Sequence, residues 1–546
     1  MLPQGSLEES PPLQPLAIAK TTPVTGFQRG RSVGIVGLIA LLVSVVGYLR
    51  EAALAARFGV SATTDAYFGA LFIPNILYVV LILGTLSPVF IPILLQGNAD
   101  EDRAQTSETF SILTTFVLLV LALAVACGMI TAPRWLPLLF AGYDAATLAV
   151  TVRLIRIIFP GVLFLAVSGI LTAALNGFHR FALPALAPAL SSLAIIAAAL
   201  VARGNNAVYV VAIATAAGFT LQGLFLVPAT ASLGIRYRPR LELRHPAIRK
   251  LVRVGGPLLL YLVVASASVL WERNLASRLS AGAVSTLTYA MRLFTVPANF
   301  LAAPLAIVAY PGLAREALRD QRGDLSNQVS RMFRLVVFLF LPVTVLMILN
   351  ALPITRVLYE HGRFLPADSL VTARVVAIYG WGILPNAIAI ILLRSFYAIE
   401  DTITPLVVEL IDLLVFVLVA PALTSRWGIT GLAISRSLTF FMVAAMFIWV
   451  LWDRRRLLTL DGRLARFLAE SGVATLAMGI VSWASLHLLK PSFEAAATAL
   501  RLGMVALVFI LSAATFLSVA RLFKMEEADR IMATALRFLP GSRRNN

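Results

Sequence analysis

A few charged side chains interrupt the long apolar runs of this sequence. Arg50 and Glu51 follow an aliphatic run that begins at Val33, and Asp65 comes shortly afterwards. A charged side chain at the centre of a membrane helix costs roughly 2.5–3.5 kcal/mol, so it normally faces a cavity, a partner or the interface. Arg50 could therefore face a cavity, or reach the interface while paired with Glu51 or Asp65. Asp65 could equally cap the helix that follows it.

A second group of charges lies deep in apolar sequence in the other half of the chain. Glu272 and Arg273 stand within "ASVLWERNLASRL", and Arg292 stands within "LTYAMRLFTVP". These three residues could form a structural ion pair between helices, but Arg292 has no acidic neighbour in sequence. Over both halves the deep charge leans positive. A cavity lined by guanidinium groups suits an anionic cargo, and the planar fork of arginine suits phosphate in particular.

Two further carboxylates share one face of a later apolar run. Glu409 and Asp412 are three residues apart, which places them together on a helix. They could form a proton or cation site, or an ion pair with Arg436. Together with Glu272, which could hold a cation while an empty transporter returns, they are the residues we predict for ion coupling.

The elements that carry these residues must be membrane helices. The chain has 546 residues, of which 59% are hydrophobic and 13% charged, with a mean hydropathy of +0.89. Continuous apolar runs of about 18 or more residues can cross a hydrocarbon core as helices. We expect an all-α polytopic membrane protein with about fourteen transmembrane helices, centred near residues 44, 80, 120, 163, 193, 220, 264, 300, 339, 384, 412, 440, 478 and 510. Six prolines predict bends in the second and eighth of these: Pro74, Pro88, Pro92, Pro297, Pro304 and Pro311.

Several classes of function are disfavoured by what the sequence lacks. Cys127 is the single cysteine, the four histidines have no metal-ligand spacing, and no phosphate-binding loop is present. We therefore expect neither an enzyme nor an ATP-driven pump, and no metal or other cofactor.

The basic residues, which give a formal net charge of +18, gather in alternate loops. By the positive-inside rule these loops and both termini face the cytoplasm, where they meet anionic lipids rather than nucleic acid.

The chain also repeats itself at an offset of about 221 residues. "REAALAARF" (50–58) aligns with "WERNLASRL" (271–279), and "TVRLIRIIFPG" (151–161) aligns with "TARVVAIYGWG" (372–382). A repeat of six helices restarts on the same side of the membrane, so it predicts two parallel six-helix lobes around a central cavity.

The predicted domains follow from this repeat. We expect a disordered cytoplasmic tail, an N-lobe, a C-lobe, two extra C-terminal helices and a basic cytoplasmic tail, over residues 1–32, 33–233, 246–452, 465–523 and 524–546.

Six segments of the sequence resemble the MurJ (formerly MviN) family of bacterial lipid II flippases, within the multidrug/oligosaccharidyl-lipid/polysaccharide exporter superfamily. They are "YLREAALAARFGVSATTDAYFGALFIPN", "SPVFIPIL", "LNGFHRFALPALAP", "ERNLASRLSAGAVSTLTYAMRLFTVP", "LYEHGRF" and "SFYAIEDTITPL". The resemblance implies that undecaprenyl-pyrophosphate-linked peptidoglycan precursor moves from the inner to the outer leaflet of the inner membrane by alternating access. It also implies that the last two helices form a groove for the lipid tail.

The resemblance also implies a substrate site. The cavity arginines of the family fall on Arg50 and Arg292, the aspartate that opens helix 2 falls on Asp65, and Arg273 follows an acidic residue as in many members. Asn75, which closes the first segment, completes the set of substrate-binding residues that we predict.

Other cargoes and roles stay open at this point. Well-studied family members carry two more arginines, where this chain has Ser44 and Tyr78. A flippase for another polyprenol-linked oligosaccharide, such as an exopolysaccharide or O-antigen unit, is therefore an alternative. An antiporter for cationic drugs and a non-transporting scaffold are less favoured. The expected partners are lipid II, membrane lipids and peptidoglycan-synthesis proteins.

Overall fold

The computed structural model describes residues 26–78, 103–318, 322–459 and 461–529, and these residues are almost entirely helical. The predicted N-terminal tail up to residue 25, Pro88 and Pro92, and the basic tail beyond residue 529 lie outside the described residues. The first helix begins at Gly26, earlier than the predicted boundary at residue 33. The all-helical membrane fold predicted from composition is confirmed.

The helices of the first half form one packed group, which we call the N-terminal group. Helix α5 packs on α7 and α2, and α6 packs on α7 and α1. Glycines allow the close approach, since a Cβ at Gly161 would lie 2.9 Å from Ala216 Cα and one at Gly218 would lie 2.8 Å from Ser191 Cα. The group contains α1 (Gly26–Phe58), α2 (Ala62–Tyr78), α4 (Arg103–Leu139), α5 (Ala145–Gly177), α6 (Ala182–Val201) and α7 (Ala207–Ala231).

The next helices form the C-terminal group, in which α8 packs on α15, α9 on α13 and α11 on α14. Its members are α8 (Pro246–Ser277), α9 (Ala283–Pro297), the π-helix η2 (Ala298–Ala302), α10 (Ala303–Leu318), α11 (Arg322–Leu349), α12 (Ala351–Tyr359), α13 (Pro366–Trp381), α14 (Ile383–Ala398), α15 (Ile403–Trp449) and the π-helix η3 (Val450–Arg454). The predicted irregularity of the eighth span is present, because the π-helix η2 begins directly after Pro297.

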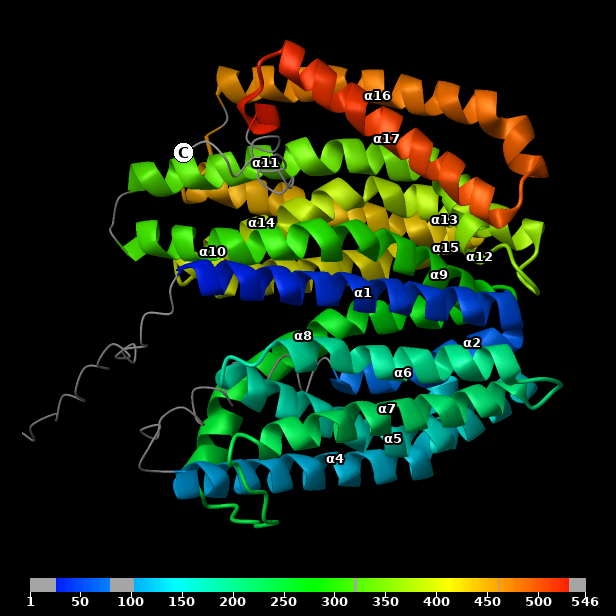
Figure 1. The fold of residues 1–546 in the computed structure, drawn as a ribbon, viewed down its shortest axis with the longest axis vertical. Helices are drawn as coiled ribbons and strands as arrows, with labels where there is room; N and C mark the ends of the chain where they lie inside the picture. Colours follow the sequence, from blue (N-terminus) through cyan, green and yellow to red (C-terminus); the bar gives the residue numbers. More distant parts are fainter. Residues whose placement is uncertain (1–25, 79–102, 319–321, 460, 530–546) are drawn as a thin grey trace, which may run out of the picture.

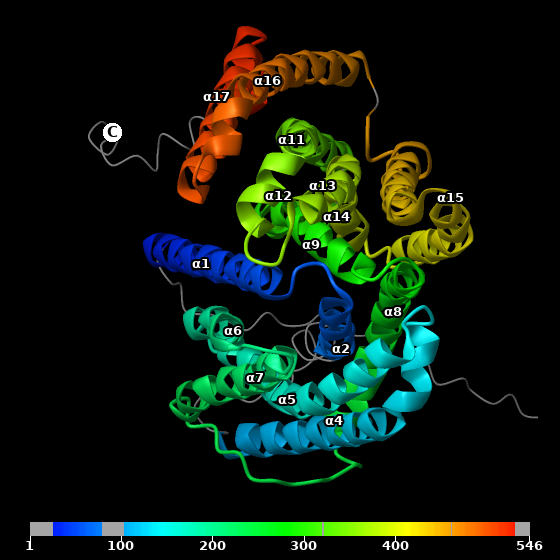
Figure 2. The same cartoon turned by 90° about the vertical axis from the view of Figure 1, so that its right-hand side faces the viewer.

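Two helices complete the chain and lie outermost. Helix α16 (Gly462–Ala495) packs on α17 (Thr498–Leu522) and on α11, and α17 also contacts α12. Figures 1 and 2 show this pair beyond α11, on the far side of the C-terminal group from α4–α7. Their position outside the repeat agrees with their packing on one group.

In the part of the chain that the structure describes, fewer than fourteen separate helices have the length and hydropathy of a membrane span. Among the described residues nine helices are long and apolar enough to cross a membrane, or ten if the pair α13–α14, bent by 43°, is one span. Helix α15 is counted once although its path breaks at Gly428, where φ is 56° and ψ is −137°. Because Gly428 lies between the predicted span centres at 412 and 440, α15 accommodates both. The total of fourteen stays a prediction.

The two groups touch at one end of the bundle, which we call the closed end. The backbone N–H of Arg363 donates to Ala56 O at 2.8 Å, and Asn274 Nδ2 donates to Leu138 O at 2.9 Å. Gly362 has φ of +58°, and a Cβ there would lie 2.3 Å from Ala56 O. Only glycine combines this backbone conformation with such a close approach. Figure 1 shows the α1–α2 and α12–α13 connections together at this end, opposite the start of α1.

Candidate functional site

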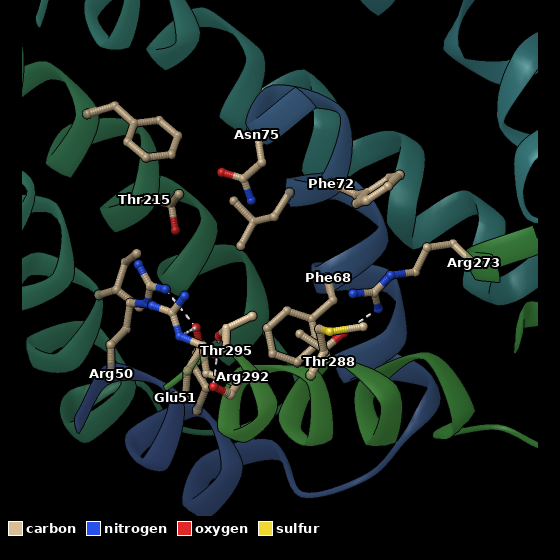
Figure 3. A pocket seen from close by; sticks show the side chains of 15 residues that line it. Arg50, Glu51, Phe68, Phe72, Asn75, Thr215, Arg273, Thr288, Arg292 and Thr295 are labelled. Carbon is tan, nitrogen blue, oxygen red and sulfur yellow. Dashed lines mark hydrogen bonds and ion pairs between the residues drawn. The ribbon is translucent and has the colours of Figure 1, made fainter. Parts of the chain in front are cut away.

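A cavity of about 230 Å³ lies between the two groups. Its walls come from α1, α2, α6 and α7 of the N-terminal group and from α8 and α9 of the C-terminal group (Figure 3). The described residues that line it are Arg50, Glu51, Leu54, Phe68, Leu71, Phe72, Asn75, Ile195, Thr215, Phe219, Arg273, Thr288, Met291, Arg292 and Thr295. Four of the five predicted substrate-binding residues are therefore brought to one place.

One carboxylate on the cavity wall is shared by two arginines. The buried Glu51 accepts a hydrogen bond through Oε1 from Arg50 Nη2 at 2.6 Å, and the same oxygen lies 3.8 Å from Arg292 Nε. Its other oxygen, Oε2, is buried and has no hydrogen-bond partner among the described residues. The sequence-based alternative that Arg50 pairs with Glu51 is thus realised inside the cavity rather than at the interface.

Arg292 reaches from α9 of the C-terminal group to α1 of the N-terminal group. A Cβ at Gly47 would lie 3.1 Å from Arg292 Nη2, so the glycine leaves room for the guanidinium. The ring of Tyr48 lies 5.5 Å from Arg292 Cζ, within the range of a cation–π contact. Arg292 and Arg50 therefore meet around Glu51 although they belong to different groups (Figure 3).

The third arginine of the cavity stands apart from this pair (Figure 3). Arg273 donates to Val284 O at 3.0 Å, contacts the hydroxyl of Thr288, and lies 5.5 Å from the centre of the Phe72 ring. These contacts fix its direction without a carboxylate. Three arginines against one glutamate give the lining a formal net charge of +2. In surroundings of low dielectric constant such a charge attracts anions strongly.

Asp65 is not among the described residues that line the cavity. Its carboxylate accepts hydrogen bonds from the backbone N–H groups of Gly282 and Ser285, both at 2.7 Å. It therefore caps α9 of the opposite group, where a negative charge stabilises a helix N-terminus. The start of its own helix is capped by Ser61 Oγ, which accepts from Thr64 N at 3.3 Å. Asp65 therefore does cap a helix, but this helix is α9 and not the one that follows it in sequence.

A second cavity, of about 350 Å³, lies within the C-terminal group. All three predicted ion-coupling residues line it, together with Arg436 from the second half of α15. Arg436 Nη2 donates to Glu272 Oε2 at 3.2 Å, and its Nη1 lies 3.8 Å from Asp412 Oδ2. Glu409 has no ion pair within 4.0 Å among the described residues.

The guanidinium of Arg436 is held on every side. It lies 3.8 Å from the centre of the Phe416 ring and also donates to Ser268 O at 3.1 Å. On the far side of Glu272, the hydroxyl of Tyr379 donates to Oε1 at 2.6 Å. A side-chain cation therefore lies between Glu272 and Asp412, and for Asp412 this is the ion pair with Arg436 that the sequence left open.

Several residues of the first cavity carry no signal in the sequence. Thr215, Thr288 and Thr295 stand in ordinary apolar runs, where a hydroxyl usually bonds to its own helix, as Thr288 Oγ1 does with Val284 O. Only the packing of α7 and α9 against α2 brings them into one cavity with the arginines.

The fold defines the class of the protein. A solved structure described as lipid II flippase MurJ in an inward closed conformation matches 88% of this chain and 98% of its own, with a TM-score of 0.73 and 20% identity. Another, described as the inward-facing conformation of a multidrug resistance MATE family transporter of the MOP superfamily, matches 77% and 98%, with a TM-score of 0.61 and 16% identity. The chain is thus a polytopic membrane protein with the fold of these transporters.

The sequence comparisons give the family. The model of the family described as lipid II flippase MurJ matches residues 54–503. The lipid II flippase MurJ of Burkholderia cenocepacia is 29% identical over 456 residues, which cover 82% of this chain and 88% of the relative. The chain belongs to the MurJ family of lipid II flippases, as its sequence segments predicted.

Proposed function

We propose that this protein is a lipid II flippase, a transporter without catalytic chemistry that moves the diphosphate-linked peptidoglycan precursor from the inner to the outer leaflet. Membership of the MurJ family supports the cargo. The observation that carries the proposal is the cavity between the two groups, which is lined by three arginines and one carboxylate. An antiporter for cationic drugs would need the opposite charge.

The diphosphate of the cargo binds where Arg50 and Arg292 converge. In the empty cavity Glu51 orients both guanidinium groups and offsets part of their charge. A diphosphate offers more charge and more acceptor oxygens than one carboxylate, and arginine can bind two oxygens at once. Arg273 and Asn75 meet the cargo from other parts of the wall, where both line the same cavity.

The size of the cavity requires the groups to move. Its volume of about 230 Å³ lies below the 300–1,000 Å³ of typical pockets for drug-sized ligands, and the sugar–peptide head of the precursor is larger than such ligands. The groups must therefore separate at one end to admit the head, and at the other end to release it. We propose that they are the lobes predicted over residues 33–233 and 246–452 and that their rocking gives alternating access.

The orientation follows from charge. The basic connection between α7 and α8 lies at the end of the bundle where α1 starts, opposite the closed end (Figure 1). We propose that this end and both termini face the cytoplasm and that the closed end faces outward from the inner membrane. The pair α16–α17, within the predicted segment 465–523, exposes apolar side chains such as Leu476 and Leu488 and would hold the polyprenyl tail.

The energy for outward movement can come from the membrane potential. Each negative charge that leaves an inside-negative cell gains about 2.3 kcal/mol per 100 mV, so a diphosphate is driven outward without ATP. The return of the empty protein is the step at which an ion can act. Since Arg436 already pairs with Glu272 and Asp412, Glu409 is the carboxylate of the three that is free to bind a proton or cation.

The proposal is tested in cells depleted of their own flippase. The wild-type protein should restore growth and the exposure of lipid II on the outer leaflet, and failure of both would overturn the function. Replacing Arg50 and Arg292 by alanine should abolish both. The matched control replaces two exposed arginines, Arg456 before α16 and Arg463 in the first turn of α16, and should behave as wild type. Full rescue by the Arg50/Arg292 variant would overturn the site while leaving the function in place.

A further inference from the structure

The segment that connects α7 to α8 is bound along the start of α4. Every second backbone N–H of this extended segment donates to a hydroxyl at every fourth position of the helix. The pairs are Arg236 with Ser107 Oγ at 3.2 Å, Arg238 with Ser111 Oγ at 3.0 Å, and Arg240 with Thr115 Oγ1 at 3.3 Å. The two repeats match because two extended residues span roughly 6.6 Å and four helical residues span about 6 Å. The segment is therefore held in one register on α4.

This register gathers three arginines around a cavity of about 600 Å³, which is also lined by Ser107, Glu108, Ser111 and Gly234. Arg240 forms ion pairs with Glu108 and, at 3.2 Å, with Glu242. The guanidinium groups of Arg236 and Arg238 form no ion pair or hydrogen bond with any described residue. The cavity thus has two arginine side chains whose charge is not offset.

Apolar side chains alternate with these arginines. In "RYRPRLELR" (236–244) Tyr237, Leu241 and Leu243 are 46%, 48% and 63% exposed. Exposed apolar groups interleaved with arginine are typical of segments that lie at the boundary between headgroups and acyl chains, where tyrosine is also enriched. A water-filled site for a free ion would need no such groups.

We propose that this cavity binds the phosphate headgroup of an anionic phospholipid. Arg236 and Arg238 bind the phosphodiester oxygens, while Tyr237, Leu241 and Leu243, which alternate with the arginines along the extended segment, hold that segment at the boundary between headgroups and acyl chains. The site is separate from the cavity of Arg50 and Arg292, and it lies on the only covalent connection between the two helix groups. The proposal depends on the proposed function in one respect only. The membrane orientation proposed there places the bound phospholipid in the cytoplasmic leaflet.

The test measures bound lipid rather than transport. The purified protein is placed in nanodiscs with equal amounts of phosphatidylglycerol and phosphatidylcholine, and the lipids that stay attached are counted by native mass spectrometry. We expect wild type to prefer phosphatidylglycerol. Since an arginine near an anionic surface contributes about fivefold in affinity, R236Q/R238Q should lower the preference about thirtyfold and each single variant about fivefold. The control R456Q/R463Q removes the same charge from two other exposed arginines and should keep the preference.

Three results would overturn the proposal. The first is an unchanged preference in R236Q/R238Q, or in R236Q and R238Q alone if the double variant does not fold, as judged by thermal unfolding in phosphatidylcholine nanodiscs. The second is an equal loss in R456Q/R463Q, which would mean general surface charge. The third is displacement of the attached lipid by millimolar inorganic phosphate, which would identify a site for free phosphate. Because flipping is not measured, failure of the proposed transport function would leave these outcomes readable.

Discussion

Removing the buried guanidinium of the C-terminal group should strongly destabilise the protein. Arg436 lies between Glu272, which is 3% exposed, and Asp412, which is 6% exposed. Arg436→Gln leaves two buried carboxylates without their cation. Breaking a buried ion pair in this way costs about 3–5 kcal/mol, because the remaining charge is neither solvated nor paired. We expect the free energy of unfolding to fall by that amount.

The assay is reversible unfolding in detergent micelles with two matched variants. Arg436→Lys keeps a positive charge and should lose less stability than Arg436→Gln. The triple variant Arg436→Gln/Glu272→Gln/Asp412→Asn removes all three charges and should recover most of the loss, since replacing a whole buried network by neutral groups is often nearly neutral.

Two outcomes would refute this reasoning. A loss below about 1 kcal/mol in Arg436→Gln would mean that the two carboxylates do not depend on the guanidinium, as in an exposed pair. A triple variant as unstable as Arg436→Gln would place the cost in lost packing against Phe416 rather than in charge. In either case Arg436 could not be described as the cation of this cavity.

Two further predictions concern contacts outside the cavities. Asp65→Asn removes the charge that caps α9, where a hydrogen bond to a charged group contributes about 1.5–3 kcal/mol. The measurement uses Cys127→Ser/Thr288→Cys, with and without Asp65→Asn, and an impermeant maleimide added from the closed end. The cysteine at position 288 should react faster when Asp65 is replaced. An unchanged rate would show that the cap does not hold that end shut. In the α14–α15 connection burial alone would raise the pKa of Asp401, but hydrogen bonds from the start of α15 and from Arg455 outweigh it and hold the pKa below its usual value. The pKa of Asp401 is lower in the folded than in the unfolded state, so wild type should be more stable than Asp401→Asn above about pH 4. This advantage should vanish as the pH falls through the folded-state pKa. A stability difference that does not depend on pH in thermal unfolding would contradict the prediction.

Composition and charge were enough to predict much of this molecule. The apolar runs predict the helices because a lipid-spanning backbone must satisfy its own hydrogen bonds. Deep charges mark a cavity because lipid would not tolerate them, and Arg50, Arg273 and Arg292 do line one. Their binding of the cargo stays a prediction.

The partners of the charged residues were harder to predict. Asp65 bonds to Gly282, 217 residues away, across the junction of the two groups. Glu272 pairs with Arg436, 164 residues away, although Arg436 was considered only as a partner for Glu409 and Asp412. The local periodicity of the sequence predicts which face of a helix is buried. It does not predict the position of that helix along its axis relative to a helix distant in sequence. A shift of one turn, about 5.4 Å, would change every such pair.

Helix α9 connects the chemistry of the two cavities. Met291 lines both of them, while the next residue, Arg292, reaches Glu51 in the first. At one end α9 is capped by Asp65 from the opposite group, and at the other it passes into the π-helix η2 after Pro297. Any displacement of α9 therefore alters both linings and the cap together. A ligand can shift the equilibrium between two positions of α9 only if its affinity differs between them. If the proposed diphosphate draws Arg292 away from Glu51, it meets this condition, and its binding would act through α9 on the closed end and on the cavity of Arg436 at once.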